Sequence, residues 1–131
     1  MYNRLLFVLL FSSFIYSKFI SLETAEKVTE HLILSKGLES NYFHIESVFT
    51  QYDDTTPLFY IINIKETGFA IVAADDRVYP LLGYSFNHYY SEDNHPIQFS
   101  DMLEFFKKQI IYVINNNIEQ DSKVKQKWDL Y

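Results

Sequence analysis

The stretch GFAIVAADDRVYPLLGYS, residues 68–85, decides the fold that we predict for this chain. After its glycine come six apolar residues, 69–74, which are rich in aromatic and β-branched side chains. A short, unbroken apolar run of this kind is typical of a strand that is buried on both faces. A polar turn follows at residues 75–77, and Pro80 then opens a second extended segment that we expect to end at Gly83. The sequence therefore predicts a central strand and a short returning strand.

Two further strands are predicted before this stretch. Residues 42–51 alternate loosely between apolar and polar side chains, which indicates a half-exposed strand with an irregularity. Residues 58–64 form a second apolar run, and a polar turn at 53–57 separates it from the first strand. Because the turn at 65–68 is short, we expect this buried strand to lie antiparallel to the strand that follows it.

One helix is predicted before the strands in the sequence, and another is predicted after them. The first begins at Ser21 or Thr24 as N-cap and ends at Gly37. The last long helix has Ser100 or Asp101 as its expected N-cap. Its apolar stripe consists of Met102, Leu103, Phe106, Ile110, Val113, Ile114 and Ile118, widened by Phe99, Phe105 and Ile111. We therefore predict a small α+β domain, with about four antiparallel strands and helices packed on one face of the sheet.

Composition limits the classes of function. The 131 residues suffice for one domain with a single two-layer core. Eleven basic and seventeen acidic side chains give a net charge of −6, and the only lysine cluster, at residues 123–127, reads as a solvated helix end or a frayed terminus. Because phosphate backbones require a basic face, we expect no nucleic-acid partner. The chain has no cysteine, which excludes disulfides, thiolate metal ligands and a cysteine nucleophile.

The first residues have the pattern of an export signal. Arg4 precedes the apolar run 5–10, and the apolar span is too short for a helix that crosses a bilayer. We predict a signal peptide at residues 1–20 and a mature domain at residues 21–131, exported to the periplasm or the extracellular space and not bound to a membrane. The alternatives are an uncleaved anchor and a buried first helix.

The organising stretch also resembles a known family. It is similar to the pro-segment of streptopain-type cysteine peptidases and to the small Spi-like inhibitors related to it. The residues that carry this motif are Gly68, Phe69, Asp75, Asp76, Arg77, Pro80, Gly83, Tyr84 and Ser85. The similarity extends upstream to the aromatic strand 59–63, which ends in an asparagine, and downstream to Gln109-Ile110 in the last helix.

The resemblance implies an α+β fold and the inhibition of a papain-like cysteine peptidase. In the family the pro-segment docks beside the cleft, so that the catalytic histidine is held away from the cysteine. The blocking group comes from the loop before the last helix, here residues 86–98, and no cofactor is involved. The resemblance thus implicates Asn87, Asn94, His95, Pro96 and Gln98 as peptidase contacts. Since the 131 residues contain no cysteine and leave no room for a catalytic domain, we expect the peptidase to be a separate partner.

Other interpretations of the same residues stay open. The loop at 86–98 could be a plain solvated loop, because polar and aromatic residues are common in solvated loops as well as in binding loops. His88, Asp93 and His95 could ligate a metal, but their spacing fits no standard site, so we predict none. The apolar end at residues 128–131 either docks on the body of the domain or is offered to a partner.

Function likewise has alternatives. The chain could be a secreted binding module of the same fold, or a truncated pro-segment without its peptidase. An adjacent gene for a streptopain-type peptidase would favour inhibition, whereas a stop codon between this frame and a downstream peptidase would favour truncation. We predict no enzyme, because neither a nucleophile with its base nor a phosphate-binding glycine loop can be assembled from these residues.

Overall fold

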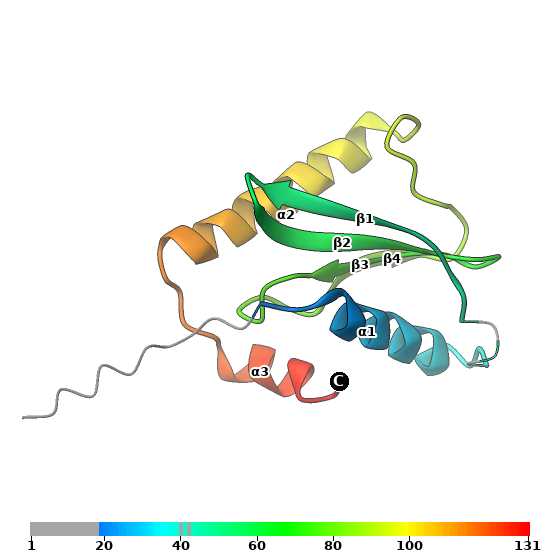
Figure 1. Ribbon diagram of the computed structural model, residues 1–131, viewed down its shortest axis with the longest axis horizontal. Helices are drawn as coiled ribbons and strands as arrows, with labels where there is room; N and C mark the ends of the chain where they lie inside the picture. The colour runs from blue at the N-terminus through cyan, green and yellow to red at the C-terminus, as the bar shows by residue number, and fades with distance from the viewer. Residues whose placement is uncertain (1–18, 40, 42) are drawn as a thin grey trace, which may run out of the picture.

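The computed structural model describes residues 19–39, 41 and 43–131, and within this part the chain forms four strands and three helices (Figure 1). The elements are α1 (Leu22–Ser35), β1 (Ile45–Asp53), β2 (Thr56–Ile64), β3 (Gly68–Ala73), β4 (Leu81–Ser85), α2 (Ile97–Asn115) and α3 (Ser122–Trp128). The strands form one antiparallel sheet in the order β1-β2-β3-β4. The predicted α+β class with about four antiparallel strands is therefore confirmed.

The helices cover both faces of the sheet. Along β2, Tyr60 and Ile62 belong to a core cluster that includes residues of α1, whereas Phe59 and Ile61 belong to a second cluster that includes residues of α2. Figure 1 shows α1 and α2 on opposite sides of the strands. The prediction of a two-layer core with helices on one face is therefore wrong. Its physical reason is visible in β3, where every residue is buried, because a strand buried on both sides needs cover on both sides.

The hairpins that join the first three strands are tight. β1 and β2 pair as far as Asp53 with Thr56, so that only residues 54 and 55 lie between them. β2 and β3 pair as far as Ile64 with Gly68. The irregularity predicted in the first strand is present as two register shifts, one near each end of β1.

The returning strand is longer than predicted. β4 continues through Gly83 to Ser85, which pairs with Phe69 of β3. Gly83 lies opposite Ile71 within the ladder, so it does not end the strand. Because of this extension, β4 ends beside the start of β3.

The N-caps differ in how well local sequence predicted them. Ser21 caps α1, since its side chain accepts a hydrogen bond from the Thr24 amide, as predicted. The N-cap of α2 is Pro96, which has an extended backbone (φ −60°, ψ 149°), so the prediction of a cap at Ser100 or Asp101 is wrong. The Ser100 hydroxyl is instead hydrogen-bonded to the ring of His95.

Two members of the predicted apolar stripe are not in the core: Phe105 of α2, and Ile118, which lies after the end of that helix and is 41% exposed. Leu103 and Ile110 are buried, and Phe106 packs against the α2-facing cluster. Phe105, by contrast, is 56% exposed. Its inclusion in the stripe is therefore wrong, because it lies one position away from Phe106 and so points about 100° away around the helix.

The C-terminal segment docks on the body of the domain. The Trp128 indole donates a hydrogen bond to the Val78 carbonyl at 2.8 Å, and the Gln120 side chain donates one to the Asp76 carbonyl at 2.6 Å. Trp128 and Tyr131 also pack against the α1-facing cluster. The apolar end at residues 128–131 therefore docks on the body of the domain, which is one of its two predicted alternatives.

The predicted signal peptide lies almost entirely outside the described residues. Ile20, within the predicted segment, is buried. Its amide donates to the Ala74 carbonyl at 3.0 Å, and its carbonyl accepts from the Tyr60 hydroxyl at 2.8 Å. Contacts with the folded body thus begin before Ser21, while the cleavage position stays a prediction. No helix in the described part of the chain has the length and apolar character needed to cross a membrane.

Candidate functional site

The candidate site is the segment between β4 and α2, residues 86–96, which we call the site loop. It is shorter than the predicted loop 86–98, because α2 already begins at Ile97. Gln98 therefore lies in the first turn of α2, where it is exposed, and its placement in the loop is wrong. Pro96 suits the boundary, since its ring fixes φ near the value that an N-cap requires and it needs no amide partner.

A close backbone approach fixes the start of the site loop. Gly68, the first residue of β3, has φ +149°, a region that side-chain-bearing residues rarely occupy. A Cβ at this position would overlap the carbonyl oxygen of Ser85 and lie 2.8 Å from the Cα of Phe86. The motif glycine thus lets the chain leave β4 directly against β3. The Asn87 amide then donates to the Ser85 hydroxyl at 3.3 Å.

Asn63 anchors the middle of the site loop. Its side chain is almost fully buried at the end of β2 and exchanges two hydrogen bonds with the backbone of Tyr90. The Tyr90 amide donates to Asn63 Oδ1, and Asn63 Nδ2 donates to the Tyr90 carbonyl, both at 2.9 Å. Asn63 Nδ2 also donates to the Ser47 hydroxyl at 3.0 Å. A buried amide requires such partners, so this residue fixes the loop to the sheet.

His95 anchors the loop to α2. Its Nδ1 lies 2.7 Å from the Ser91 carbonyl oxygen, and its Nε2 lies 2.8 Å from the Ser100 hydroxyl. Because a carbonyl only accepts, Nδ1 carries the proton, and in the neutral ring Nε2 accepts from Ser100. The ring also stacks on Tyr90, with centroids 5.5 Å apart, and meets Phe99 edge-on. His95 thus closes the loop into a compact turn.

Between these anchors the loop presents polar side chains to solvent. Asn87 and the run 91–94 are exposed, whereas Tyr90 is buried and His95 is half-buried. Of the predicted contact residues, Asn87, Asn94 and Pro96 are therefore accessible, and His95 is turned inward. Sequence reasoning missed the anchoring roles of Asn63 and Tyr90. The available signal was an asparagine inside a strand of buried apolar residues.

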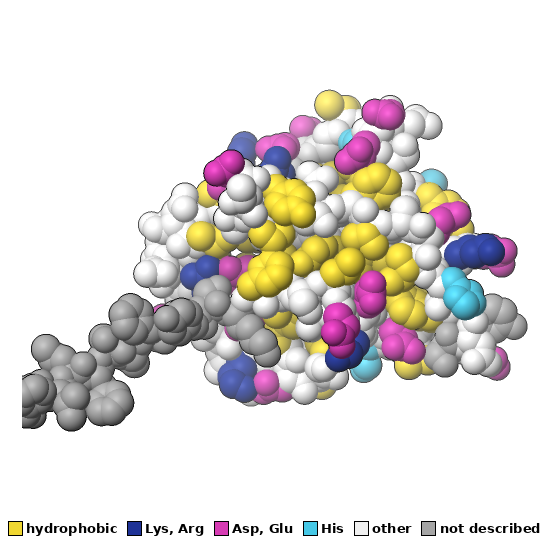
Figure 2. All heavy atoms as spheres, viewed as in Figure 1, with side chains coloured by type: hydrophobic (Ala, Val, Ile, Leu, Met, Phe, Trp, Pro, Cys, Tyr) yellow, Lys and Arg dark blue, Asp and Glu magenta, His cyan; other side chains and the backbone are white. Residues whose placement is uncertain are grey.

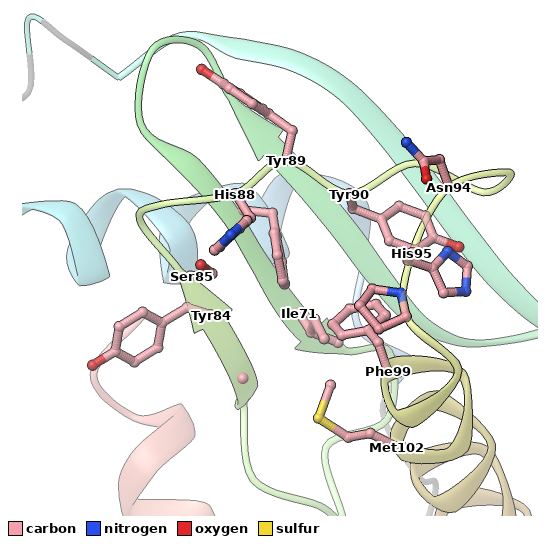
Figure 3. A pocket seen from close by; sticks show the side chains of 13 residues that line it. Ile71, Tyr84, Ser85, His88, Tyr89, Tyr90, Asn94, His95, Phe99 and Met102 are labelled. Atoms are coloured by element: carbon pink, nitrogen blue, oxygen red, sulfur yellow. The ribbon is translucent and has the colours of Figure 1, made fainter.

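A cavity of about 450 Å³ lies beside the site loop, and we call it the loop cavity (Figure 3). Its lining includes Phe69, Ile71, Gly83, Tyr89, Phe99 and Met102. Asn94, His95 and Pro96 also line it, so the loop forms one of its walls. In Figure 3 the ring of Tyr84 points away from Ile71 and Phe99. That ring instead lies under Lys36, whose Nζ is 5.2 Å from the ring centroid.

The Asp-Asp-Arg part of the motif lies at the other end of β3 and has a structural role. Asp75 accepts from the Arg77 amide and from two guanidinium nitrogens at 2.9 and 2.7 Å, and both side chains are largely buried. This hydrogen bond, opposed in part by burial, raises the pKa of Arg77 above its ordinary value. Pro80 is buried next to this turn, and its carbonyl accepts from the Ala73 amide. These residues shape the turn on which the C-terminal segment docks.

The site loop is acidic and offers no metal centre. Burial, and secondarily the charge of Glu92, raise the pKa of the Tyr90 phenol above 10.0, so the ring stays neutral. Asp93 adds a second exposed carboxylate. Among the described residues, no group of three or more His, Asp or Glu side chains is placed to hold a metal ion. The loop can therefore bind through shape, hydrogen bonds and negative charge.

Comparison with protein-family models identified a matching family. The model of a family described as Spi protease inhibitor matches residues 17–110, which is well over half of the chain. The matched region contains α1, the whole sheet, the site loop and most of α2, and it ends before α3. No curated protein and no solved structure matches the chain.

Proposed function

Since this chain belongs to the Spi protease inhibitor family, we propose that it inhibits a streptopain-type, papain-like cysteine peptidase. The partner would be a separate protein that the chain meets after export. The motif at residues 68–85 and the geometry of the site loop support three parts of this proposal. These parts are the class of peptidase, the mode of docking and the contact residues.

The observation that carries the proposal is the anchoring of the site loop. Asn63 holds the backbone of Tyr90, and His95 ties the loop to α2, so the exposed run 91–94 is presented on a fixed base. A preformed loop loses little conformational freedom on binding, which favours tight association. Such a loop suits a protein that must dock beside the cleft of a peptidase without being reshaped by it.

The proposed mechanism requires no chemistry from the inhibitor. A papain-like peptidase acts through a cysteine thiolate that is activated by a neighbouring histidine. A loop that docks beside the cleft and occupies the position of that histidine separates the base from the nucleophile. We propose that Asn87 and Asn94 make the polar contacts, because their amides are exposed at the two ends of the loop. His95 and Pro96 would position them.

The test is a titration of residues 18–131 into an active streptopain-type peptidase, with an unrelated papain-like peptidase as a selectivity control. The key variant replaces Glu92, Asp93 and Asn94 with glycine, serine and glycine, and it keeps Tyr90 and His95. We expect the unchanged chain to inhibit the streptopain-type enzyme selectively. We expect the variant to raise the inhibition constant at least tenfold, because it removes the exposed groups and loosens the run that carries them.

A matched control makes the same exchange at the opposite end of the sheet, at Asp53, Asp54 and Thr55 of the first hairpin. It also removes two carboxylates, so both variants have the same net charge. Equal weakening by the two variants would point to net charge alone and contradict a loop-specific mechanism. No inhibition at micromolar excess of the unchanged chain would contradict the proposed function and favour a binding module or a truncated pro-segment.

A further inference from the structure

The loop cavity exists because the α2-facing side of the sheet is covered unevenly. α2 packs chiefly against β1 and β2. The cavity lies over the other half of that face, where Phe69 and Ile71 of β3 and Gly83 of β4 contribute to its lining. No third helix among the described elements covers this half. In place of a helix, the site loop borders it, so the cavity is continuous with the surface that we assign to peptidase binding.

The chemistry of the cavity combines an apolar interior with polar groups from the loop. Phe69, Ile71, Phe99 and Met102 contribute apolar side chains. Figure 3 shows Ile71 of β3 facing Phe99 and Met102 of α2. Polar groups come from His88, Asn94 and His95 of the loop. Cavities of this size and composition bind apolar groups, with a few polar groups that fix orientation.

Gly83 keeps the cavity open on the side of β4. It pairs with Ile71 across the ladder, so a side chain at either position would point to the same face of the sheet. A Cβ at Gly83 would have Ile71 Cδ1 as its nearest neighbour, at 3.8 Å, which is ordinary van der Waals contact. The position could therefore carry a side chain without backbone strain, and the absence of one leaves space above Ile71.

Negative charge lies next to the cavity. Glu92 and Asp93 are exposed on the site loop directly before Asn94, and the whole chain has a net charge of −6. On the face that Figure 2 shows, exposed hydrophobic side chains of the described part of the chain gather in the middle, with acidic and basic side chains around them. Two carboxylates beside an apolar cavity favour a partner group that is apolar and has a basic neighbour.

We propose that the loop cavity receives an apolar side chain of the target peptidase, from a surface segment that also carries a lysine or arginine facing Glu92 and Asp93. This inference depends on the proposed function and deepens it, because it adds a second anchor beside the site loop. The loop would block the catalytic groups, and the cavity would hold the inhibitor in place. A buried apolar anchor of this kind dominates the affinity of many protein interfaces.

The experiment fills the cavity from inside the inhibitor. Gly83→Leu adds a side chain over Ile71 from β4, and Met102→Phe enlarges a half-buried side chain from α2. Gly83→Ala adds only a Cβ at the same position and therefore fills less of the same space, which gives a graded comparison with Gly83→Leu. Inhibition constants are measured by titration into the streptopain-type peptidase, and thermal unfolding of each free variant reports on its fold.

We expect Gly83→Leu and Met102→Phe each to weaken inhibition at least tenfold, with unfolding temperatures within a few degrees of that of the unchanged chain. Gly83→Ala should weaken inhibition less than Gly83→Leu does. Two filling variants from different elements protect the test against a folding defect in one of them. Unchanged inhibition by a folded filling variant would overturn the cavity proposal and leave the loop mechanism standing. If the unchanged chain does not inhibit the peptidase, both proposals fall.

The proposed lysine or arginine of the peptidase, opposite Glu92 and Asp93, is tested on the same complex. Glu92→Gln with Asp93→Asn removes the rim charge and keeps the size of both side chains. We expect this variant to associate at least threefold more slowly at low ionic strength and to show a smaller dependence on salt, because screening weakens charge steering. An unchanged association rate at low salt would overturn the assignment of a basic group opposite these carboxylates.

Discussion

At the scale of single residues, Gly68 determines where the site loop begins. Its φ is +149°, and backbone atoms of Ser85 and Phe86 lie where a Cβ would stand, so there is no space for a side chain. Backbone atoms cannot move aside as the end of a flexible side chain can. Gly68→Ala should therefore displace the start of the site loop. We expect the free energy of unfolding to fall by about 2 kcal/mol or more, as overpacking of a buried position does, measured by urea denaturation.

Gly37→Ala is the control, because it measures the cost of a side chain at a positive φ without a steric clash. Gly37 also has a positive φ, +77°, but a Cβ there would meet no atom within 4 Å. Gly37→Ala should cost only about 1 kcal/mol, the usual penalty of a side chain in the left-handed region, and should leave inhibition unchanged. If the two substitutions cost the same, the close approach of β3 to the site loop would not be what Gly68 permits.

At the scale of elements, α3 holds the turn after β3. Its Trp128 donates to the Val78 carbonyl, and Gln120 just before α3 donates to the Asp76 carbonyl, so the turn of residues 75–80 is fixed from outside. In Figure 1, α3 lies away from the segment between β4 and α2, which is at the far end of the molecule. Stability and binding should therefore respond separately to changes in α3.

The prediction for α3 is a loss of stability without a loss of inhibition. Trp128→Phe keeps an aromatic ring but removes the indole donor, which leaves the Val78 carbonyl without this partner. We expect the free energy of unfolding to fall by about 1 kcal/mol, the usual net value of such a hydrogen bond, with an unchanged inhibition constant. Leu130→Ala, at an exposed position in the same segment, is the control and should change stability by less than about 0.5 kcal/mol. A weaker inhibitor with normal stability would show that α3 contacts the partner.

At the scale of the whole molecule, the aromatic interior makes stability depend on pH in the alkaline range. Burial raises the pKa values of Tyr60, Tyr90 and Tyr131 above the ordinary value of 10.0, with smaller contributions from Tyr52 for Tyr60 and from Glu92 for Tyr90. The unfolded chain therefore releases these protons first. As pH rises above 10.0, the unfolded state binds fewer protons than the folded state, so the free energy of unfolding falls until the folded-state pKa values are passed.

Tyr131→Phe tests this dependence, because burial alone accounts for the shift of Tyr131. Below pH 9 the variant should follow the unchanged chain with a constant offset, since the phenol is neutral in both states. Above pH 10 its free energy of unfolding should decrease less steeply, by up to about 1.4 kcal/mol per pH unit, the contribution of one proton. Urea denaturation at a series of pH values measures both slopes. Parallel curves over the whole range would contradict a partly buried Tyr131 with a raised pKa.

Much of the fold could be predicted from local sequence. The apolar run 69–74 identified the central strand, and the Ser21 cap and Gly37 identified the bounds of α1, because hydrophobic periodicity and capping chemistry act over a few residues. The motif at 68–85 predicted the family that the comparison confirmed. The same run, buried on both faces, already required cover on both sides of the sheet, and the prediction of helices on one face overlooked this.

The rest was decided by tertiary structure. Whether a helix covers one face of the sheet or the other depends on how the chain crosses over. The apolar periodicity within the helix does not indicate which face the helix covers. The anchors of the site loop join Asn63 to Tyr90, 27 positions apart, and the loop cavity exists only because α2 leaves half of a sheet face uncovered. By itself, the sequence determined the strands, the cap of α1 and the family. Long-range packing determined which loop residues face solvent, because those contacts form only when distant segments meet.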